Sequence, residues 1–161
     1  ISARNDLARE LLMRLSDETE ELDTTLYQDP RQAAVDRAGA IPKALQDFAK
    51  TALDKALQDP QALARVLGEY LTEPKANVWF EERSVSKLPK QLKLDRRSRM
   101  MYDDKHIFLN GESWRASGRD AQLMRILADQ RALLAPQILG ASQSAKKILL
   151  SWVKSGWLKS Y

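Results

Sequence analysis

The sequence predicts a mainly α protein built from two unlike domains, a three-helix dimerisation domain (residues 1–82) and an α+β domain (residues 92–161). Apolar residues recur every three or four positions through the first part, which is the spacing of helices with one buried face. Beyond residue 91, short apolar and aromatic runs alternate with turn sequences, which indicates strands followed by further helices. The charge changes at the same place. Residues 1–82 hold 10 Lys and Arg against 16 Asp and Glu, a net of −6, whereas residues 83–161 hold 16 against 6, a net of +10. Residues 83–91 are therefore expected to be a linker.

Composition places the chain among globular proteins and excludes several other classes. Its 161 residues, 43% of them hydrophobic, suit one ordinary domain or two small ones. No apolar run approaches the ~20 residues of a membrane span, and the charged N-terminal segment does not resemble a signal peptide. The chain has no cysteine, which excludes disulfides and thiolate metal sites. We expect a cytoplasmic protein that does not bind membranes. Because it begins at Ile1, we also expect a processed or excised fragment.

Capping residues and apolar stripes mark the first and third expected helices. Asn5 or Ser2 is expected to cap the first helix, whose stripe consists of Leu7, Leu11, Leu15 and Leu22. The third helix is expected to begin at Asp59-Pro60, a cap followed by a first-turn proline, and to end before Pro74. An irregular segment, residues 26–42, separates the first two helices.

The second expected helix begins near Pro42 and carries an alanine-rich apolar face. The members of this face recur three and four residues apart: Leu45, Phe48, Ala49, Ala52, Leu53, Ala56 and Leu57. Small side chains let another helix approach closely, and three short helices bury little surface by themselves. We therefore expect this face to form a homodimer. Packing only within the chain is the alternative.

The basic half begins with strand and turn signals. The runs LKLD, RMMYDD and HIFLNGESWRAS contain the apolar and aromatic residues that strands favour. Asp103-Asp104-Lys105 is expected to form one turn. Asn110-Gly111 is expected to form a type I′ turn, which needs positive φ at both central residues. The sequence therefore predicts a β-hairpin in this region.

Three helices and a closing strand are expected to follow the hairpin. Ser117 is expected to cap the first of them, and a short second helix, LAPQIL, stops at Gly140. Ser142 is expected to cap the third, which ends at Gly156 in a left-handed conformation and buries Ile148, Leu149, Trp152 and Val153. GWLKSY would form the last strand. A hairpin, three helices and a final strand are typical of a winged helix.

The net charge of +10 makes the basic half a candidate for binding a polyanion. The candidate contacts are Arg96, Arg97, Arg99, Lys146 and Lys147. In DNA readers the third helix enters the major groove, but here it offers no arginine for a bidentate contact with guanine, and Arg83 and the other arginines are expected to lie away from it. We therefore expect weak, sequence-indifferent binding of nucleic acid at most. The alternative is a protein-docking module whose cations form a solvated face.

Nothing in the sequence indicates catalysis. The single histidine, His106, cannot form a site that needs two or three imidazoles, and it is expected to face solvent or the hairpin edge. The six glycines are scattered, so no phosphate-binding loop is present. We predict no catalytic, metal-binding or cofactor-binding residue in this chain.

The stretches LYQDPRQAAVDRAGAIPKALQDF and YLTEPKANVWFE, followed by a basic hairpin and winged helix, carry a family resemblance. They resemble the C-terminal part of bacterial JmjC/cupin ribosomal oxygenases, which are 2-oxoglutarate- and Fe(II)-dependent enzymes that hydroxylate an arginine of a ribosomal protein. The resemblance covers nearly the whole chain and implies a catalytic barrel, then a helical dimerisation domain, then a winged helix. The family's iron-binding His-x-Asp and distal His have no counterpart here. Fe(II) and 2-oxoglutarate are therefore expected only in a catalytic domain outside this chain.

By this resemblance the chain is a non-catalytic region that supplies dimerisation and docking to an enzyme acting on a ribosomal protein. Residues 70–82 then form the junction between domains, where Val78, Trp79 and Phe80 are expected to anchor the segment against one of them. The competing interpretation is a DNA-binding winged-helix transcriptional regulator with a helical dimerisation domain. The reading frame upstream of residue 1 distinguishes the two, because only the first requires a barrel that carries His-x-Asp.

Overall fold

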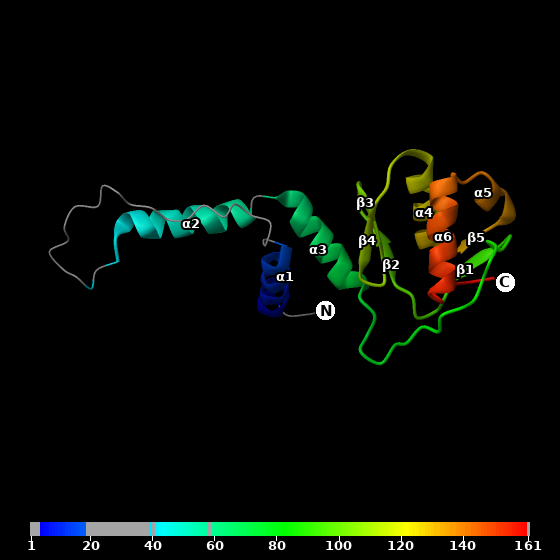
Figure 1. The fold of residues 1–161 in the computed structure, drawn as a ribbon, viewed down its shortest axis with the longest axis horizontal. Coiled ribbons are helices and arrows are strands. Elements are labelled where there is room, and N and C mark those ends of the chain that lie inside the picture. Colours follow the sequence, from blue (N-terminus) through cyan, green and yellow to red (C-terminus); the bar gives the residue numbers. More distant parts are fainter. Residues whose placement is uncertain (1–3, 19–38, 40, 58, 161) are drawn as a thin grey trace. The chain divides into compact units, whose positions relative to one another are not determined.

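The computed structural model describes residues 4–18, 39, 41–57 and 59–160, and the chain divides into two compact units, Ile1–Val66 and Leu67–Tyr161 (Figure 1). The predicted mainly α fold with a small β component is confirmed. The domain limits at residues 82 and 92 stay a prediction, although the contacts already place Leu67–Tyr161 in one unit. No helix in the described ranges is long and apolar enough to cross a membrane.

The N-terminal unit contains α1 (Arg4–Glu18), α2 (Lys43–Leu57) and the first half of α3 (Pro60–Thr72). Asp59 caps α3 as predicted, because its carboxylate accepts the Gln61 backbone N–H at 2.8 Å. Asn5 is not a cap, since it lies inside α1, and Ser2 and Leu22 fall outside the described residues. The irregular segment predicted after α1 also falls largely outside them.

Few of the described apolar side chains of this unit are buried. Only Leu15 and Val66 have less than a tenth of their surface exposed. The exposed large apolar side chains are Leu12, Met13, Ile41, Leu45, Phe48, Leu53, Leu57 and Leu63. Burial of apolar surface is the main force that stabilises folded chains. The N-terminal unit therefore differs from the C-terminal unit, which contains nearly all of the buried apolar residues of the described chain.

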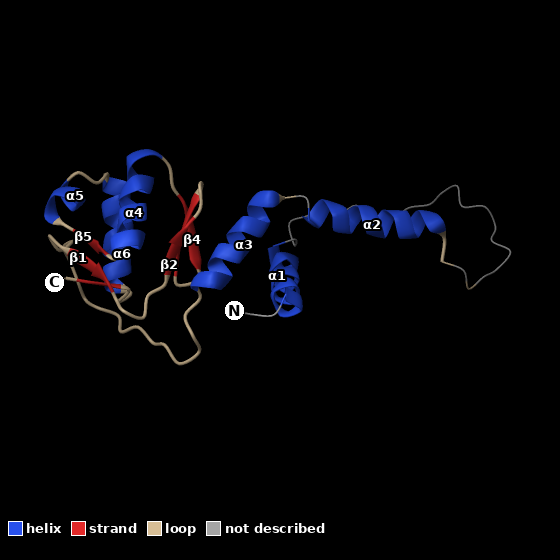
Figure 2. Ribbon diagram, turned by 180° about the vertical axis from the view of Figure 1, so that it is seen from behind, coloured by secondary structure: helices blue, strands red, loops and turns tan. Residues whose placement is uncertain are grey.

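The C-terminal unit contains two three-stranded antiparallel sheets, three complete helices and the second half of α3 (Figure 2). One sheet has the order β5-β1-β6 and the other β2-β3-β4. The strands are β1 (Leu92–Leu94), β2 (Met100–Tyr102), β3 (His106–Leu109), β4 (Glu112–Arg115), β5 (Ala132–Leu133) and β6 (Leu158–Lys159). The helices are α4 (Gly118–Gln130), α5 (Ala135–Leu139) and α6 (Gln143–Lys154). Of these elements, only β5 was not predicted.

Both predicted turns of the second sheet are present. Between β2 and β3, the Asp103 carboxylate accepts the backbone N–H groups of Lys105 and His106. Between β3 and β4, Asn110 and Gly111 have φ of 52° and 90°, so both central residues adopt the positive φ of a type I′ turn. The turn fixes the register in which Leu109 pairs with Glu112.

The core of this unit joins both sheets to α4 and α6. Its members include Leu92, Leu94, Ile107, Leu109, Leu127, Leu133, Leu149, Trp152 and Leu158. Trp114 packs edge-on against Trp152, with ring centroids 5.0 Å apart. A single continuous core explains why these short strands are stable, since strands of two to four residues gain little from their own hydrogen bonds.

Both ends of α6 are capped within the chain. At its start, the Ser142 hydroxyl accepts the Ala145 backbone N–H, as predicted. At its end, the carbonyls of residues 151–154 accept hydrogen bonds from the backbone N–H groups of Ser155, Trp157, Gly156 and Arg83. Gly156 has the predicted left-handed conformation, with φ of 75°. Ser117 lies at the N-cap position of α4, but its side chain makes no capping bond.

The segment between α3 and β1 is extended and is held against the C-terminal unit. Arg99 Nη1 donates to the Glu73 carbonyl, Arg97 Nη1 donates to the Trp79 carbonyl, and the Arg83 N–H donates to the Lys154 carbonyl. Val85 and Leu88 pack on the core. The expected linker 83–91 is therefore irregular in backbone conformation but is not a free tether. Phe80 is half-buried beside Trp157, whereas the expectation that Trp79 packs inward is wrong, because 75% of its surface is exposed.

Strand β3 is buried on both faces because the second half of α3 covers the side that faces away from the core. Ile107 and Leu109 point into the core, and Phe108 meets Gly68 of α3. Next to this contact, the buried Thr72 hydroxyl accepts the Gly111 N–H and donates to the Gly68 carbonyl. A Cβ atom at position 68 would overlap the Phe108 ring, so glycine is required for this approach.

We predict that Gly68→Ala destabilises the C-terminal unit by about 1–3 kcal/mol, because the overlap outweighs the better helix propensity of alanine. All four tryptophans lie at residue 79 or beyond, so their fluorescence during urea unfolding measures this unit. Gly140→Ala is the matched control, since Gly140 has a φ of −75° and a Cβ there would make only ordinary contacts. Equal stability of the two variants would contradict the prediction.

Candidate docking surfaces of the C-terminal unit

His106 and Asp103 form a structural pair. His106 is 8% exposed, which corrects the expectation that it faces solvent, and its Nδ1 lies 3.2 Å from Asp103 Oδ2. Burial works against the charged form of Asp103, but hydrogen bonds from Lys105 and His106 hold the pKa of its carboxyl below the ordinary value. Within the described part of the chain, no three His, Cys, Asp or Glu side chains lie close enough together to hold a metal ion.

The charged centre of this unit is Asp95, at the end of β1, with only 2% of its surface exposed. Its carboxylate accepts hydrogen bonds from the backbone N–H and guanidinium of Arg97 at 2.9–3.2 Å and is paired with Lys159 of β6. Its backbone carbonyl accepts from Arg131 at 2.8 Å, and its N–H donates to the Trp157 carbonyl. The hydrogen bond from Arg97, assisted by Lys159, holds the pKa of Asp95 far below its usual range despite burial.

The five predicted polyanion contacts lie on two elements, and three of them already have partners inside the protein. Arg97 binds Asp95 and lies over the Phe80 ring, Arg99 binds the Glu73 carbonyl, and Lys146 Nζ donates to the Leu139 carbonyl at 2.9 Å. Arg96, in the β1–β2 connection, and Lys147, on α6, are exposed. The structure therefore divides the five between the β1–β2 connection and α6.

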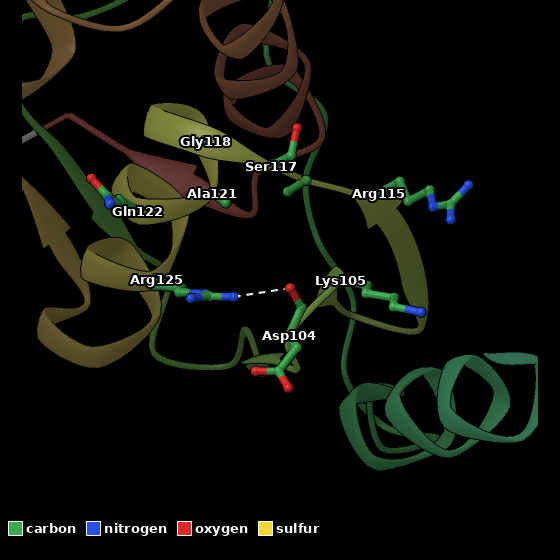
Figure 3. A pocket seen from close by; sticks show the side chains of 9 residues that line it. Asp104, Lys105, Arg115, Ser117, Gly118, Ala121, Gln122 and Arg125 are labelled. Atoms are coloured by element: carbon green, nitrogen blue, oxygen red, sulfur yellow. Dashed lines mark hydrogen bonds between the residues drawn. The ribbon is translucent and has the colours of Figure 1, made fainter. Parts of the chain in front are cut away.

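A hollow of about 700 Å³ lies between α4 and the open end of the β3–β4 hairpin (Figure 3). Three cations line it, but Arg125 Nη2 is bonded to the carbonyls of Asp103 and Asp104. Lys105 and Arg115 extend away from Arg125, and the Asp104 carboxylate lies at the edge of the hollow. An anion placed there would meet a carboxylate as well as cations, so the charge of this hollow is mixed rather than basic.

A second surface runs along the exposed side of α6. Lys154 and Ser151 line a shallow hollow of about 500 Å³ together with Glu82, Arg83, Ser84 and Ser155. The expectation that Arg83 lies away from the third helix is wrong, since its backbone N–H donates to the Lys154 carbonyl at 2.7 Å. Lys154 was not among the predicted contacts, although its distance of seven residues from Lys147 places both on one side of a helix.

The protein family follows from comparison with known sequences. The family model of the ROXA-like winged helix matches residues 55–159, which is more than half of the chain. The chain belongs to the ROXA-like winged-helix family. The match begins before α3 and ends in β6, so it includes the helix that covers the hairpin. No curated protein matches the chain.

Solved structures share the fold of this ROXA-like protein. E. coli YcfD is 19% identical, with a TM-score of 0.77 over 94% of this chain and 44% of that one. The Escherichia coli ribosomal oxygenase YcfD is 17% identical, with a TM-score of 0.77 over 99% of this chain and 46% of that one. YcfD in complex with cobalt and succinic acid is 18% identical, with a TM-score of 0.75 over 94% and 45%. The chain therefore spans less than half the length of these structural relatives.

We predict that Asp95→Asn lowers the free energy of unfolding of the ROXA-like winged helix by about 2–3 kcal/mol at pH 7. The stabilisation from a depressed carboxyl pKa is complete above the pKa of the unfolded state and is lost as pH falls through the pKa of the folded state. The difference between wild type and variant should therefore shrink as pH falls below about 4. Tryptophan fluorescence during urea unfolding at several pH values measures it.

The exposed residue Asp104 provides the control for this series. Asp104→Asn should leave stability within about 0.5 kcal/mol of wild type at every pH. A difference between wild type and Asp95→Asn that stays constant down to pH 2 would show that the carboxylate charge is not the stabilising feature.

Proposed function

We propose that the chain is the non-catalytic region of a 2-oxoglutarate- and Fe(II)-dependent oxygenase that hydroxylates a ribosomal protein in the cytoplasm. The observation that carries this proposal is the ROXA-like family match over residues 55–159. It is supported by the fold shared with YcfD, a ribosomal oxygenase that has also been solved in complex with cobalt and 2-oxoglutarate. The described residues do not fit a metal site themselves, because they hold one histidine and no cluster of three ligands.

In this proposal the N-terminal unit supplies the dimer interface. Of the side chains on the predicted face of α2, Leu45, Phe48, Leu53 and Leu57 are 37–66% exposed in the single chain. Ala49 and Ala52 are also exposed, which leaves room for a second helix to approach, and the Ala56 side chain lies outside the described ones. A homodimer would remove this surface from water.

We expect the chain to be a homodimer, and Leu53→Asp to shift it to monomer, because a carboxylate in an apolar interface loses its hydration without gaining a partner. Light scattering after gel filtration at ~100 μM measures the mass, a concentration that would detect even a weak dimer. Asp54→Ala, on the neighbouring position of α2, is the control and should remain dimeric. A monomeric wild-type chain at this concentration would exclude the dimer.

The winged helix would act as a docking module that brings the catalytic domain to its ribosomal-protein substrate. Helix α6 is capped at both ends by hydrogen bonds within the chain, and the net charge of +10 over residues 83–161 favours an acidic partner. Binding of nucleic acid is expected to be weak and to depend on salt.

We predict that the isolated chain neither retains Fe(II) nor forms succinate from 2-oxoglutarate. The reason is its ligand set, because one imidazole cannot complete the two-histidine, one-carboxylate site of such enzymes. Metal analysis after gel filtration and a succinate assay against a protein-free control provide the measurement. Stoichiometric iron or succinate above the control would contradict the prediction.

A further test separates this proposal from the alternative of a DNA-binding transcriptional regulator. The natural gene should encode, upstream of residue 1, a barrel with a His-x-Asp pair, and the complete enzyme should hydroxylate a ribosomal protein in the presence of 2-oxoglutarate. A reading frame that starts close to residue 1 would instead favour the regulator.

A further inference from the structure

The exposed side of α6 consists only of uncharged polar and basic residues. The exposed positions of this helix are Gln143, Ser144, Lys147, Ser151 and Lys154, and none of them is acidic. The last four follow one another at intervals of three, four and three residues, so they form a single stripe along the helix. At a rise of ~1.5 Å per residue, the two lysines lie about 10 Å apart along it.

The stripe continues onto the segment that precedes β1. The backbone bond from Arg83 to the Lys154 carbonyl holds this segment beside the end of α6. Arg83, Ser84 and Ser155 thereby join Ser151 and Lys154 around the shallow hollow of about 500 Å³. One carboxylate, that of Glu82, also lines this hollow and opposes the binding of an anion there. We name the stripe and this hollow together the α6 surface: Ser144, Lys147, Ser151, Lys154, Ser155, Glu82, Arg83 and Ser84.

The C-terminal end of a helix normally disfavours anions, because its last four carbonyls have no partner within the helix. In α6 these four carbonyls all accept backbone hydrogen bonds from residues 155, 156, 157 and 83. Their negative ends are therefore directed at N–H groups of the chain. The lysine and arginine at this end can then determine the sign of the local potential.

We propose that the α6 surface binds double-stranded RNA along its sugar–phosphate backbone, without reading the base sequence. The three cations match the charge of phosphates. The four serine hydroxyls can both donate and accept hydrogen bonds, which is what a ribose 2′-hydroxyl requires, and the wide, shallow minor groove of A-form RNA presents phosphates and 2′-hydroxyls together. This inference deepens the docking role proposed above. It rests on the proposed function only in taking ribosomal RNA to be near the ribosomal-protein substrate.

The start of α6 is less suited to entering the major groove of DNA. The Asp120 carboxylate accepts hydrogen bonds from the Ser142 backbone and hydroxyl, so a negative charge lies at this end of the helix. Lys146, which points to the Leu139 carbonyl, is already bonded. The basic charge is therefore spread along the side of the helix rather than concentrated at its tip, which is the part that reads bases in helix-turn-helix proteins.

The test titrates the full chain into a 20-base-pair RNA duplex and, separately, into a DNA duplex of the same sequence. Fluorescence anisotropy measures binding at 50 and 200 mM salt. We expect RNA to bind at 50 mM salt more tightly than DNA, and the affinity to fall steeply at the higher salt. A second RNA duplex of unrelated sequence should bind equally well.

The site is tested by two triple variants that remove the same charge. Arg83→Gln/Lys147→Gln/Lys154→Gln should weaken RNA binding about tenfold or more at 50 mM salt and lower the slope of log affinity against log salt by about 3. Lys75→Gln/Arg96→Gln/Lys105→Gln removes three exposed cations elsewhere in the same unit and should change both quantities little. Glu82→Gln should strengthen binding.

Three results would overturn the inference. Equal losses in the two triple variants would mean that only the net charge attracts RNA. Equal or tighter binding of DNA would assign the surface to DNA, and no binding of either duplex at 50 mM salt would remove the site. None of these results bears on dimerisation or on the upstream barrel, so the proposed function is judged separately.

Discussion

The buried carboxylate of Asp95 is the constraint on which much of the C-terminal unit depends. It lies where β1 ends, and its backbone and side chain together contact the β1–β2 connection, the loop after α4 and strand β6. A carboxylate with 2% of its surface exposed is tolerated only when its charge is paired and its oxygens accept hydrogen bonds. The cations that satisfy it therefore have to be in place, and this requirement ties β6 and the β1–β2 connection to one arrangement.

Arg97 extends this arrangement beyond the sheet. The same guanidinium that binds Asp95 also donates to the Trp79 carbonyl and lies over the Phe80 ring. A planar group with five donors can serve several acceptors at once, which lysine could not do in the same geometry. An arginine that sequence composition assigns to a solvated or polyanion-binding face thus has a structural role.

The elements of the C-terminal unit could be predicted because their signals are local. Asn110-Gly111 specifies its turn by backbone conformation, and Ser142 and Gly156 mark the two ends of α6. Strand β5 escaped prediction because two residues give no period, and its place depends on pairing with the distant β1. The contacts of Arg97 with the Trp79 carbonyl and the Phe80 ring escaped for the same reason, since these partners lie far from it in the sequence. Its bond to Asp95 and the contact between His106 and Asp103 are local, but sequence spacing alone does not show that Asp95 and His106 are buried. The family resemblance was confirmed by the family match, whereas no local pattern indicated that Arg83 meets α6.

The segment between α3 and β1 has a consequence for how this module can be inherited. Its backbone is tied at Glu73, Trp79 and Arg83 to residues that lie far along the chain, and Gly68 fits against Phe108. A recombination event that joined a foreign sequence directly to β1 would remove the cover of strand β3. It would also remove the Trp79 carbonyl that accepts from Arg97 and the Arg83 N–H that donates to the end of α6. The unit that can be exchanged between genes therefore starts upstream of Gly68, which agrees with a family match that begins at residue 55 rather than at the first strand.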